Sequence, residues 1–340
     1  MDQGICSIRT SRLKTIDMDS KIVLNVAKED GRSRLKESYH NAPYKLTHYG
    51  AANLTDHLEM IIMSASPGIM DTDHLHIDVH VKEEAQLKLF TQSFNKLHPM
   101  KTGASQHTDV QVASGGILHY IPHPVTPFKD SIFKATNHIH LAEDAVLMWG
   151  DIISVGRIYM KEAFEFDRLH TQTKIFRSGK LAFIDNQLLQ PKKQPIQKML
   201  FFEGYTHQAT FLFSANFEQE LKNELDEILT VEYNDISYGF TQASSDVVIL
   251  RALGSDGELL YDFLQMLGQL CWDFTMHKLS ESKEVEVIEN EGAEPLPVVA
   301  ESVVAESVLT ESVVAKKKST ASPRKKRVNK SKTEEGLKYA

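Results

Sequence analysis

Hydrophobic and polar residues alternate along much of residues 21–213, and this period of two predicts a chain built mainly of β-strands. The alternation is strictest in residues 74–81, HLHIDVHV, where every second residue is aliphatic. Because successive side chains of a strand point to opposite faces, one face of this segment is apolar and the other is polar. The polar face carries His74, His76, Asp78 and His80.

Similar runs rich in Val, Ile, Phe and Thr predict further strands at short spacing, in residues 21–27, 57–64, 85–94, 106–112, 116–121, 131–141, 145–155, 163–176, 181–189, 205–213 and 246–253. A turn at residues 28–31 separates the first run from a polar strand at 32–40, so we expect an opening hairpin. Three prolines in residues 121–128 exclude a helix or a central strand and predict an extended segment.

Two segments have the helical period instead. Residues 217–230 place Leu221 and Leu225 on one face, with Asn216 as the expected N-cap. Residues 256–278 carry apolar side chains at steps of three and four, with Asp256 as the expected cap. Gly268 weakens the middle of this second helix, because glycine is a poor helix former.

The composition changes after residue 280. Residues 298–317 repeat with a period of five (VVAES, VVAES, VLTES, VVAKK), which fits neither a helix nor a strand. Residues 281–311 hold nine glutamates and one lysine, whereas residues 316–332 hold nine Lys or Arg and no acid. We therefore expect an N-terminal lead (1–20), a β-rich domain (21–280) and a disordered tail (281–340). The basic run could contact nucleic acid, but a solubilising tail is the favoured interpretation.

The overall composition is that of an ordinary soluble protein. The chain has 340 residues, 41% of them hydrophobic and 25% charged, with a net charge of -8. No run approaches the about 18 apolar residues of a membrane helix, and the N-terminus lacks an apolar core of signal-peptide length. With only Cys6 and Cys271, both expected to be reduced, the chain is predicted to be cytoplasmic.

The histidine-rich strand is a candidate metal site. Same-face neighbours on a strand lie roughly 6.6 Å apart, and imidazole is a preferred ligand of zinc, nickel and copper, so His74, His76 and His80 are candidate ligands. Asp71 and Asp73 in the preceding turn add carboxylate oxygens. An antiparallel strand with one face in water would show the same alternation without any ligand. A cupin-like β-barrel metalloprotein using the His74-Leu-His76 strand is the alternative function, although the glutamate expected after it is missing.

The common catalytic motifs are absent from the sequence, which counts against an enzyme. There is no Walker A loop, G-x-S-x-G, C-x-x-C or H-E-x-x-H. Arg157 and Glu162 lie between two predicted strands that are rich in Phe and Ile. Burying an unpaired charge there would be costly, so these two side chains must be paired or line a water-filled cavity.

The order of several short motifs resembles the urease accessory protein family UreD, also called UreH. The resemblance covers about residues 20–278 and is carried by Ala42-Pro43, Gly68 with Asp73, Thr91-Gln92 with Lys96, Ile121-Pro122-x-Pro124-x-x-Pro127-Phe128, Gly156-Arg157 with Glu162 and Phe164, and Leu250-Arg251. It implies a mostly β fold of irregular stacked sheets, β-helix-like, with two α-helices near the C-terminal end of the folded region.

The resemblance also implies a function. UreD-like proteins are non-enzymatic scaffolds that bind apo-urease and carry UreF, through which the GTPase UreG is recruited, so that nickel reaches the urease active site. The resemblance also implies a homodimer within the UreD–UreF–UreG complex. It implies no binding to a membrane or to nucleic acid. No tightly bound cofactor is implied, only Ni²⁺ in transit. The expected nickel route passes Asp73, Thr91, Gln92, Arg157 and Glu162.

Overall fold

The computed structural model describes residues 18–50, 55–198, 201–229 and 235–291. By its internal contacts the chain divides into two units, Met1–Val285 and Glu286–Ala340, and the fold described below lies in the first. Cys6 and the predicted tail from residue 292 onward lie outside the described residues. None of the helices in the described residues combines the length and the apolar composition of a membrane-spanning segment.

Seven strands form the first sheet, here called sheet A. Its five central strands run parallel, and antiparallel β2 and β16 close its two edges. In spatial order the strands are β16 (Lys180–Leu189), β15 (Arg168–Arg177), β11 (Ile132–Leu141), β8 (Ala104–Val112), β5 (Asp73–Val81), β1 (Met18–Glu29) and β2 (Arg32–His40).

Ten strands form the second sheet, sheet B. In spatial order its main path is β18 (Ile236–Ser244), β19 (Val247–Gly254), β17 (His207–Ser214), β12 (Val146–Ser154), β9 (Ile117–Tyr120), β6 (Gln86–Thr91), β4 (Leu58–Ser64) and β3 (Tyr44–His48). Short strands β7 (Asn95–Leu97) and β10 (Val125–Pro127) extend it beside β12. A separate hairpin, β13 (Gly156–Arg157) and β14 (Glu162–Ala163), flanks the 3₁₀ turn Ile158–Met160.

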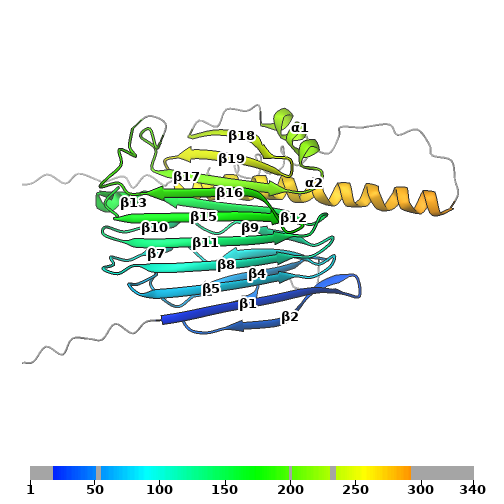
Figure 1. Cartoon of the computed structure of the whole chain (residues 1–340), viewed down its shortest axis with the longest axis horizontal. Helices are drawn as coiled ribbons and strands as arrows, with labels where there is room; N and C mark the ends of the chain where they lie inside the picture. Colours follow the sequence, from blue (N-terminus) through cyan, green and yellow to red (C-terminus); the bar gives the residue numbers. More distant parts are fainter. Residues whose placement is uncertain (1–17, 51–54, 199–200, 230–234, 292–340) are drawn as a thin grey trace, which may run out of the picture. The chain divides into compact units, whose positions relative to one another are not determined.

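The chain passes back and forth between the two sheets, so each sheet gains its parallel strands one at a time (Figure 1). The aliphatic faces of both sheets meet in one core, which includes Leu24, Ile77 and Val110 of sheet A and Leu89 and Leu118 of sheet B. Burying each such side chain stabilises the fold by about 1.5–3 kcal/mol. The predicted fold, mostly β with stacked sheets and two helices near the C-terminal end of the folded region, is confirmed.

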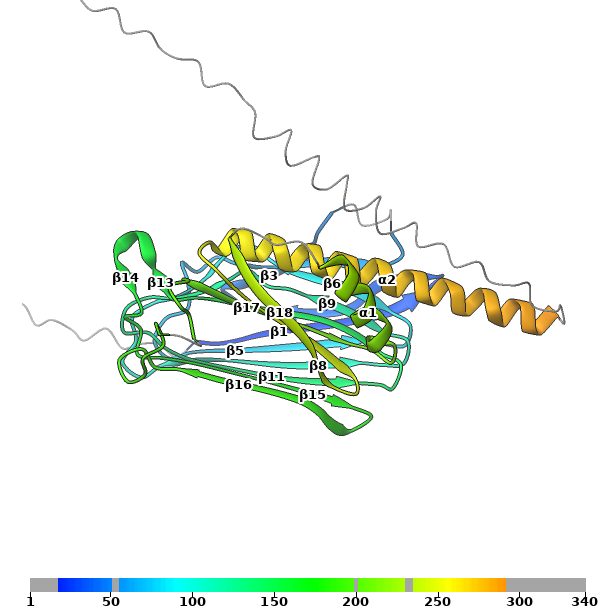
Figure 2. The ribbon, with the colours of Figure 1, turned by 90° about the horizontal axis from the view of Figure 1, so that it is seen from above.

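Helix α1 (Glu218–Ile228) and the part of α2 (Gly257–Glu291) up to Leu279 pack on the side of sheet B that faces away from sheet A (Figure 2). Asp256 caps α2 as predicted, because its Oδ1 accepts hydrogen bonds from the N–H groups of Glu258 (2.8 Å) and Leu259 (3.1 Å). The predicted cap Asn216 is wrong: the N-cap of α1 is Phe217, whose ring packs against Phe213.

Local features of the sequence account for other parts of the fold. The opening hairpin forms as predicted, with a β-bulge between Asn25 and Val26. Strand β5 has one buried apolar face and one face open to water, as the ligand-free alternative described, but it is parallel to both of its neighbours, so the antiparallel pairing assumed there is wrong. Helix α2 continues to Glu291, beyond the boundary at residue 280 that composition suggested.

Candidate functional site

A cavity of about 220 Å³ lies between the inner faces of the two sheets. Most inward positions of these strands are aliphatic, yet polar side chains from both sheets line this space. They include Thr91, Gln92, Gln106, His123, Asn137 and Asp151. A polar cavity of this size has room for several water molecules. The cavity is therefore a polar compartment with room for water inside an otherwise apolar sandwich.

Asp151 is the acidic group of this cavity. It lies on the inner side of β12, on the same face as Trp149 and Ile153, and its side chain is half-buried in the cavity wall. Burial raises the pKa of Asp151 to about 7; the carboxylate of Asp185 adds to this shift, and the guanidinium of Arg251 opposes it. The Arg251 Nη2 atom is itself paired with Asp185 Oδ1 at 2.8 Å. Asp151 can therefore exchange a proton, or accept a cation, near neutral pH.

Thr91 and His123 form the neighbouring part of the wall. The Thr91 hydroxyl lies 3.0 Å from His123 Nδ1 and accepts a hydrogen bond of 2.8 Å from the His123 backbone N–H. The ring of Tyr261 in α2 stacks on the imidazole, with centroids 4.0 Å apart. Burial lowers the pKa of His123, against the effect of the Thr91 hydrogen bond, so its imidazole is neutral at pH 7. A neutral imidazole can coordinate a divalent ion.

The turn between β4 and β5, which crosses from sheet B to sheet A, reaches the cavity only through its first half. Ser66, Pro67 and Gly68 line the cavity, whereas Asp73 borders a separate pocket of about 10 Å³. The carboxylate of Asp73 accepts a hydrogen bond of 2.7 Å from the N–H of Met70. Asp73 thus closes the turn and lies beside the cavity rather than in its wall.

Asp71 has the same kind of structural role. Its Oδ1 accepts hydrogen bonds from the N–H groups of Thr102 (2.9 Å) and Gly103 (2.8 Å). Although burial opposes ionisation, these backbone hydrogen bonds lower the pKa of Asp71. Its carboxylate holds the turn against the next loop.

Arg157 and Glu162 are paired with each other, one of the two alternatives expected for these charges. The guanidinium donates to both carboxylate oxygens at 2.6–2.9 Å across the β13–β14 hairpin and lies 4.1 Å from the ring centroid of Phe128. Gly156 permits this close pairing, since its φ is 130° and a Cβ there would lie 2.3 Å from the Glu162 carbonyl oxygen. Neither Arg157 nor Glu162 lines the cavity.

The three predicted histidine ligands lie outside the cavity, on the outer face of sheet A. Residues His74 and His76 are exposed and His80 is half-buried. His74 Nδ1 is hydrogen-bonded to Ser105 Oγ at 2.7 Å, and the ring of His76 lies beside that of His107, with centroids 6.0 Å apart. The cupin alternative requires such histidines to converge inside a barrel. Here they are spread along the outside of an open sheet.

Fold and site together define a class of protein: a two-sheet β-scaffold with a polar cavity between its sheets. The family model described as "UreD urease accessory protein" matches residues 18–285. The chain therefore belongs to the UreD family of urease accessory proteins, and its role is in urease maturation.

Known members of the family resemble the chain over most of its length. It is 33% identical to the "Urease accessory protein UreD" of Flavobacterium johnsoniae, over 72% of this chain and 89% of that protein. It is 32% identical to the UreD protein of Acetivibrio thermocellus (75% and 97%) and 29% identical to the UreH protein of Helicobacter hepaticus (70% and 92%). These three names describe accessory proteins and state no enzymatic activity.

Sequence reasoning identified Thr91 and Gln92 of the cavity wall but missed Asp151, Asn137 and His123 as lining residues. Asp151 had a usable signal, because it is the lone carboxylate in the apolar strand VLMWGDIIS. A charge in such a strand must be compensated or face water. Asn137 and His123 carried no comparable signal, since each lies in a segment with other polar residues.

Proposed function

We propose that this protein is a non-enzymatic scaffold that binds apo-urease and helps to deliver nickel to its active site, together with UreF and the GTPase UreG. In this proposal UreG is recruited through UreF, the assembly is cytoplasmic, and a second copy of the chain can join it. Nickel is cargo and not a resident cofactor. The observation that carries the proposal is the polar cavity between the sheets, with Asp151 in its wall.

The lining of the cavity suits an ion in transit. Its titratable side chains are Tyr44, Lys96, Tyr120, His123 and Asp151. Carboxylate, neutral imidazole and water are all acceptable ligands for a divalent ion such as Ni²⁺. A closed set of four protein ligands would hold the ion tightly, whereas scattered ligands and water allow it to be exchanged. The cavity supports passage better than storage.

The expected route residues divide into two groups on this proposal. Thr91 and Gln92 belong to the cavity wall, and Asp151 and His123 join them there. Asp73 borders the smaller pocket beside the cavity. We place Arg157 and Glu162 outside this part of the route, because their charges are already satisfied by each other.

A deletion experiment with metal analysis tests the proposal. Urease produced in cells that lack this protein should assemble its subunits but contain little nickel, and the full chain should co-purify with UreF, UreG and the urease subunits. Full nickel occupancy of urease without the protein would overturn the delivery role. Failure to co-purify would overturn the scaffold role.

A further inference from the structure

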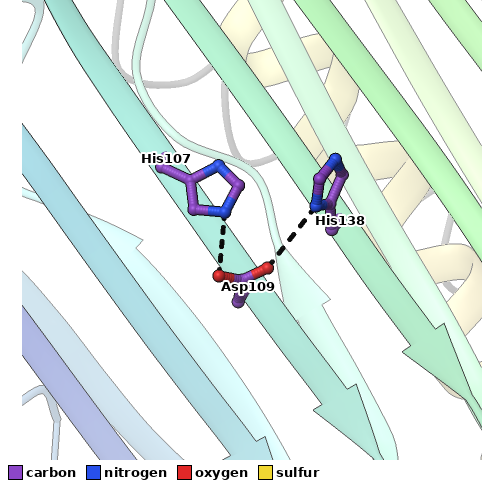
Figure 3. A group of neighbouring side chains, drawn as sticks. All are labelled: His107, Asp109 and His138. Atoms are coloured by element: carbon purple, nitrogen blue, oxygen red, sulfur yellow. Dashed lines mark ion pairs between the residues drawn. The ribbon is translucent and has the colours of Figure 1, made fainter.

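A second set of metal-ligating side chains lies on the opposite face of sheet A from the cavity. It consists of His107 and Asp109 of β8 and His138 of β11 (Figure 3). The intervening residues, Thr108, Val110 and Ile139, are buried and point inward. The outer-face set is therefore separated from the cavity by the sheet itself.

The parallel register of the sheet brings these three side chains together. His138 lies opposite Asp109 on the adjacent strand, and His107 precedes Asp109 by two residues on the same face. Neighbouring strands are about 4.8 Å apart, so both imidazoles reach the one carboxylate. His107 Nε2 lies 2.9 Å from Asp109 Oδ2, and His138 Nδ1 lies 3.7 Å from Asp109 Oδ1.

We propose that His107, Asp109 and His138 bind one late first-row divalent transition ion, of the Ni²⁺, Cu²⁺ and Zn²⁺ class, on the outer face of sheet A. One ligand atom from each residue lies within 4.8 Å of the other two. In a tetrahedral site with bonds of about 2.0–2.1 Å, ligand atoms stand about 3.4 Å apart. The sheet holds the three backbones in place, so small rotations of the side chains are enough to bring the ligand atoms from separations of up to 4.8 Å to this spacing.

The exposure of the set suits metal binding. Between 32% and 42% of each side chain is exposed, which leaves one side open to water and to an entering ion. A bound ion would replace the direct contact of 2.9 Å between His107 Nε2 and Asp109 Oδ2.

Neighbouring residues define the rest of the coordination shell and its charge. The exposed His76 lies opposite His107 in the pairing register, with ring centroids 6.0 Å apart, and is the nearest candidate for a fourth ligand. Asp78, opposite Asp109 on β5, is already paired with Lys21 at 2.9 Å. Lys174 lies opposite His138 on β15, and its positive charge opposes a bound cation.

Two identical imidazole donors and one carboxylate select the metal class. Imidazole favours nickel, copper and zinc, whereas Mg²⁺ and Ca²⁺ prefer sites made of oxygen alone. The inference stands on the geometry of this face and does not rest on the proposed function. The site and the delivery role can therefore fail separately.

Titration of the purified full chain with ZnCl₂ and with NiCl₂ tests the proposal, with MgCl₂ as the negative control. The wild type should bind one equivalent of Zn²⁺ or Ni²⁺ at this site. The double variant His107→Ala/His138→Ala should bind that equivalent at least ~10-fold more weakly. His170→Ala is the matched control, because His170 lies on the same face of β15 but is hydrogen-bonded to Asn186 at 2.8 Å. Lys174→Gln should tighten binding by about two- to fivefold. Unchanged binding in the double variant would overturn the site.

A second measurement on the unmodified protein covers the case in which the double variant fails to fold. Zn²⁺ should protect His107 and His138 from diethylpyrocarbonate, as mapped by mass spectrometry, while His170 remains reactive. If the modification of His107 and His138 is the same with and without Zn²⁺, as it is expected to be for His170, the proposal is wrong. Urease nickel content in cells carrying the folded double variant then shows separately whether delivery depends on this site.

Discussion

Thr91 and His123 are joined at the wall of the internal cavity by two contacts through a single hydroxyl group. Thr91 Oγ1 accepts a hydrogen bond of 2.8 Å from the backbone N–H of His123 and lies 3.0 Å from the Nδ1 atom of the same residue. This pair ties the end of β6 to the proline-rich segment that follows β9. The pair holds the neutral imidazole of His123 in the cavity wall.

Replacing Thr91 by Val should destabilise the protein. Valine has nearly the same shape but cannot accept the His123 N–H, so a partly buried donor loses its partner, at a cost of about 1–3 kcal/mol. Urea denaturation measures this loss. The control is Thr241→Val on the exposed face of β18, which should change stability by less than about 0.5 kcal/mol. Equal effects of the two substitutions would contradict the assigned role of the pair.

Asp151 should make the stability of the protein fall between about pH 4 and pH 7. Its carboxyl releases a proton near pH 7 in the folded protein but near its ordinary pKa of 3.8 in the unfolded chain. Between these values the unfolded state binds fewer protons, so the free energy of unfolding decreases as the pH rises. Asp151→Asn has no such carboxyl group. As the pH rises through this range, its free energy of unfolding should therefore increase relative to that of the wild type by at least about 1.4 kcal/mol, which corresponds to a shift of one pKa unit.

Urea denaturation of both proteins at about pH 4.5 and pH 7.5 measures this gain. The comparison with Asp151→Asn isolates one group, because other titrating residues such as His119 are present in both proteins. A stability difference that is the same at both pH values would show that the Asp151 carboxyl is not held protonated by its surroundings.

Gly268 in α2 should resist substitution although alanine is the better helix former. A Cβ at this position would lie 2.4 Å from His119 Nε2 and 2.6 Å from Ile121 Cδ1. Overpacking of this kind typically costs about 1–3 kcal/mol, which exceeds the about 1 kcal/mol gained in helix propensity. We expect Gly268→Ala to lower the melting temperature. Gly239→Ala is the control, because nothing lies within 4 Å of a Cβ at that position. A more stable Gly268→Ala protein would contradict this account.

Glu162→Gln should leave nickel delivery intact. The Glu162 carboxylate forms an ion pair with Arg157 on a partly exposed hairpin and does not line the cavity. Partly exposed ion pairs contribute about 0–1 kcal/mol, so we expect a small loss of stability and a normal nickel content in urease. A large loss of nickel with the complex intact would move the route to the β13–β14 hairpin.

The sequence predicted the strands well because each strand has one buried face, and burial imposes the period of two. It could not predict how the strands pair. The parallel register that sets His138 opposite Asp109 arises from passes between two sheets, which no local pattern encodes. For this reason the histidines of β5 were identified as a possible metal set, whereas the group that spans two strands was not.

The candidate site was predictable only in part, for a related reason. Thr91 and Gln92 entered through the family resemblance, and the structure places both in the cavity wall. Asp73 and Arg157 came from the same resemblance but are engaged by Met70 and Glu162, respectively, outside that wall. A motif marks a residue as constrained, but it does not say whether the constraint is structural or functional.

The nickel content of urease matured with Asp151→Asn tests the central claim most directly. The wild type and Glu162→Gln serve as references, and co-purification with the urease subunits shows that each variant still enters the complex. We predict that urease matured with Asp151→Asn contains several-fold less nickel per active site than urease matured with either reference. Full nickel loading by Asp151→Asn, with the complex intact, would contradict passage of nickel through the cavity.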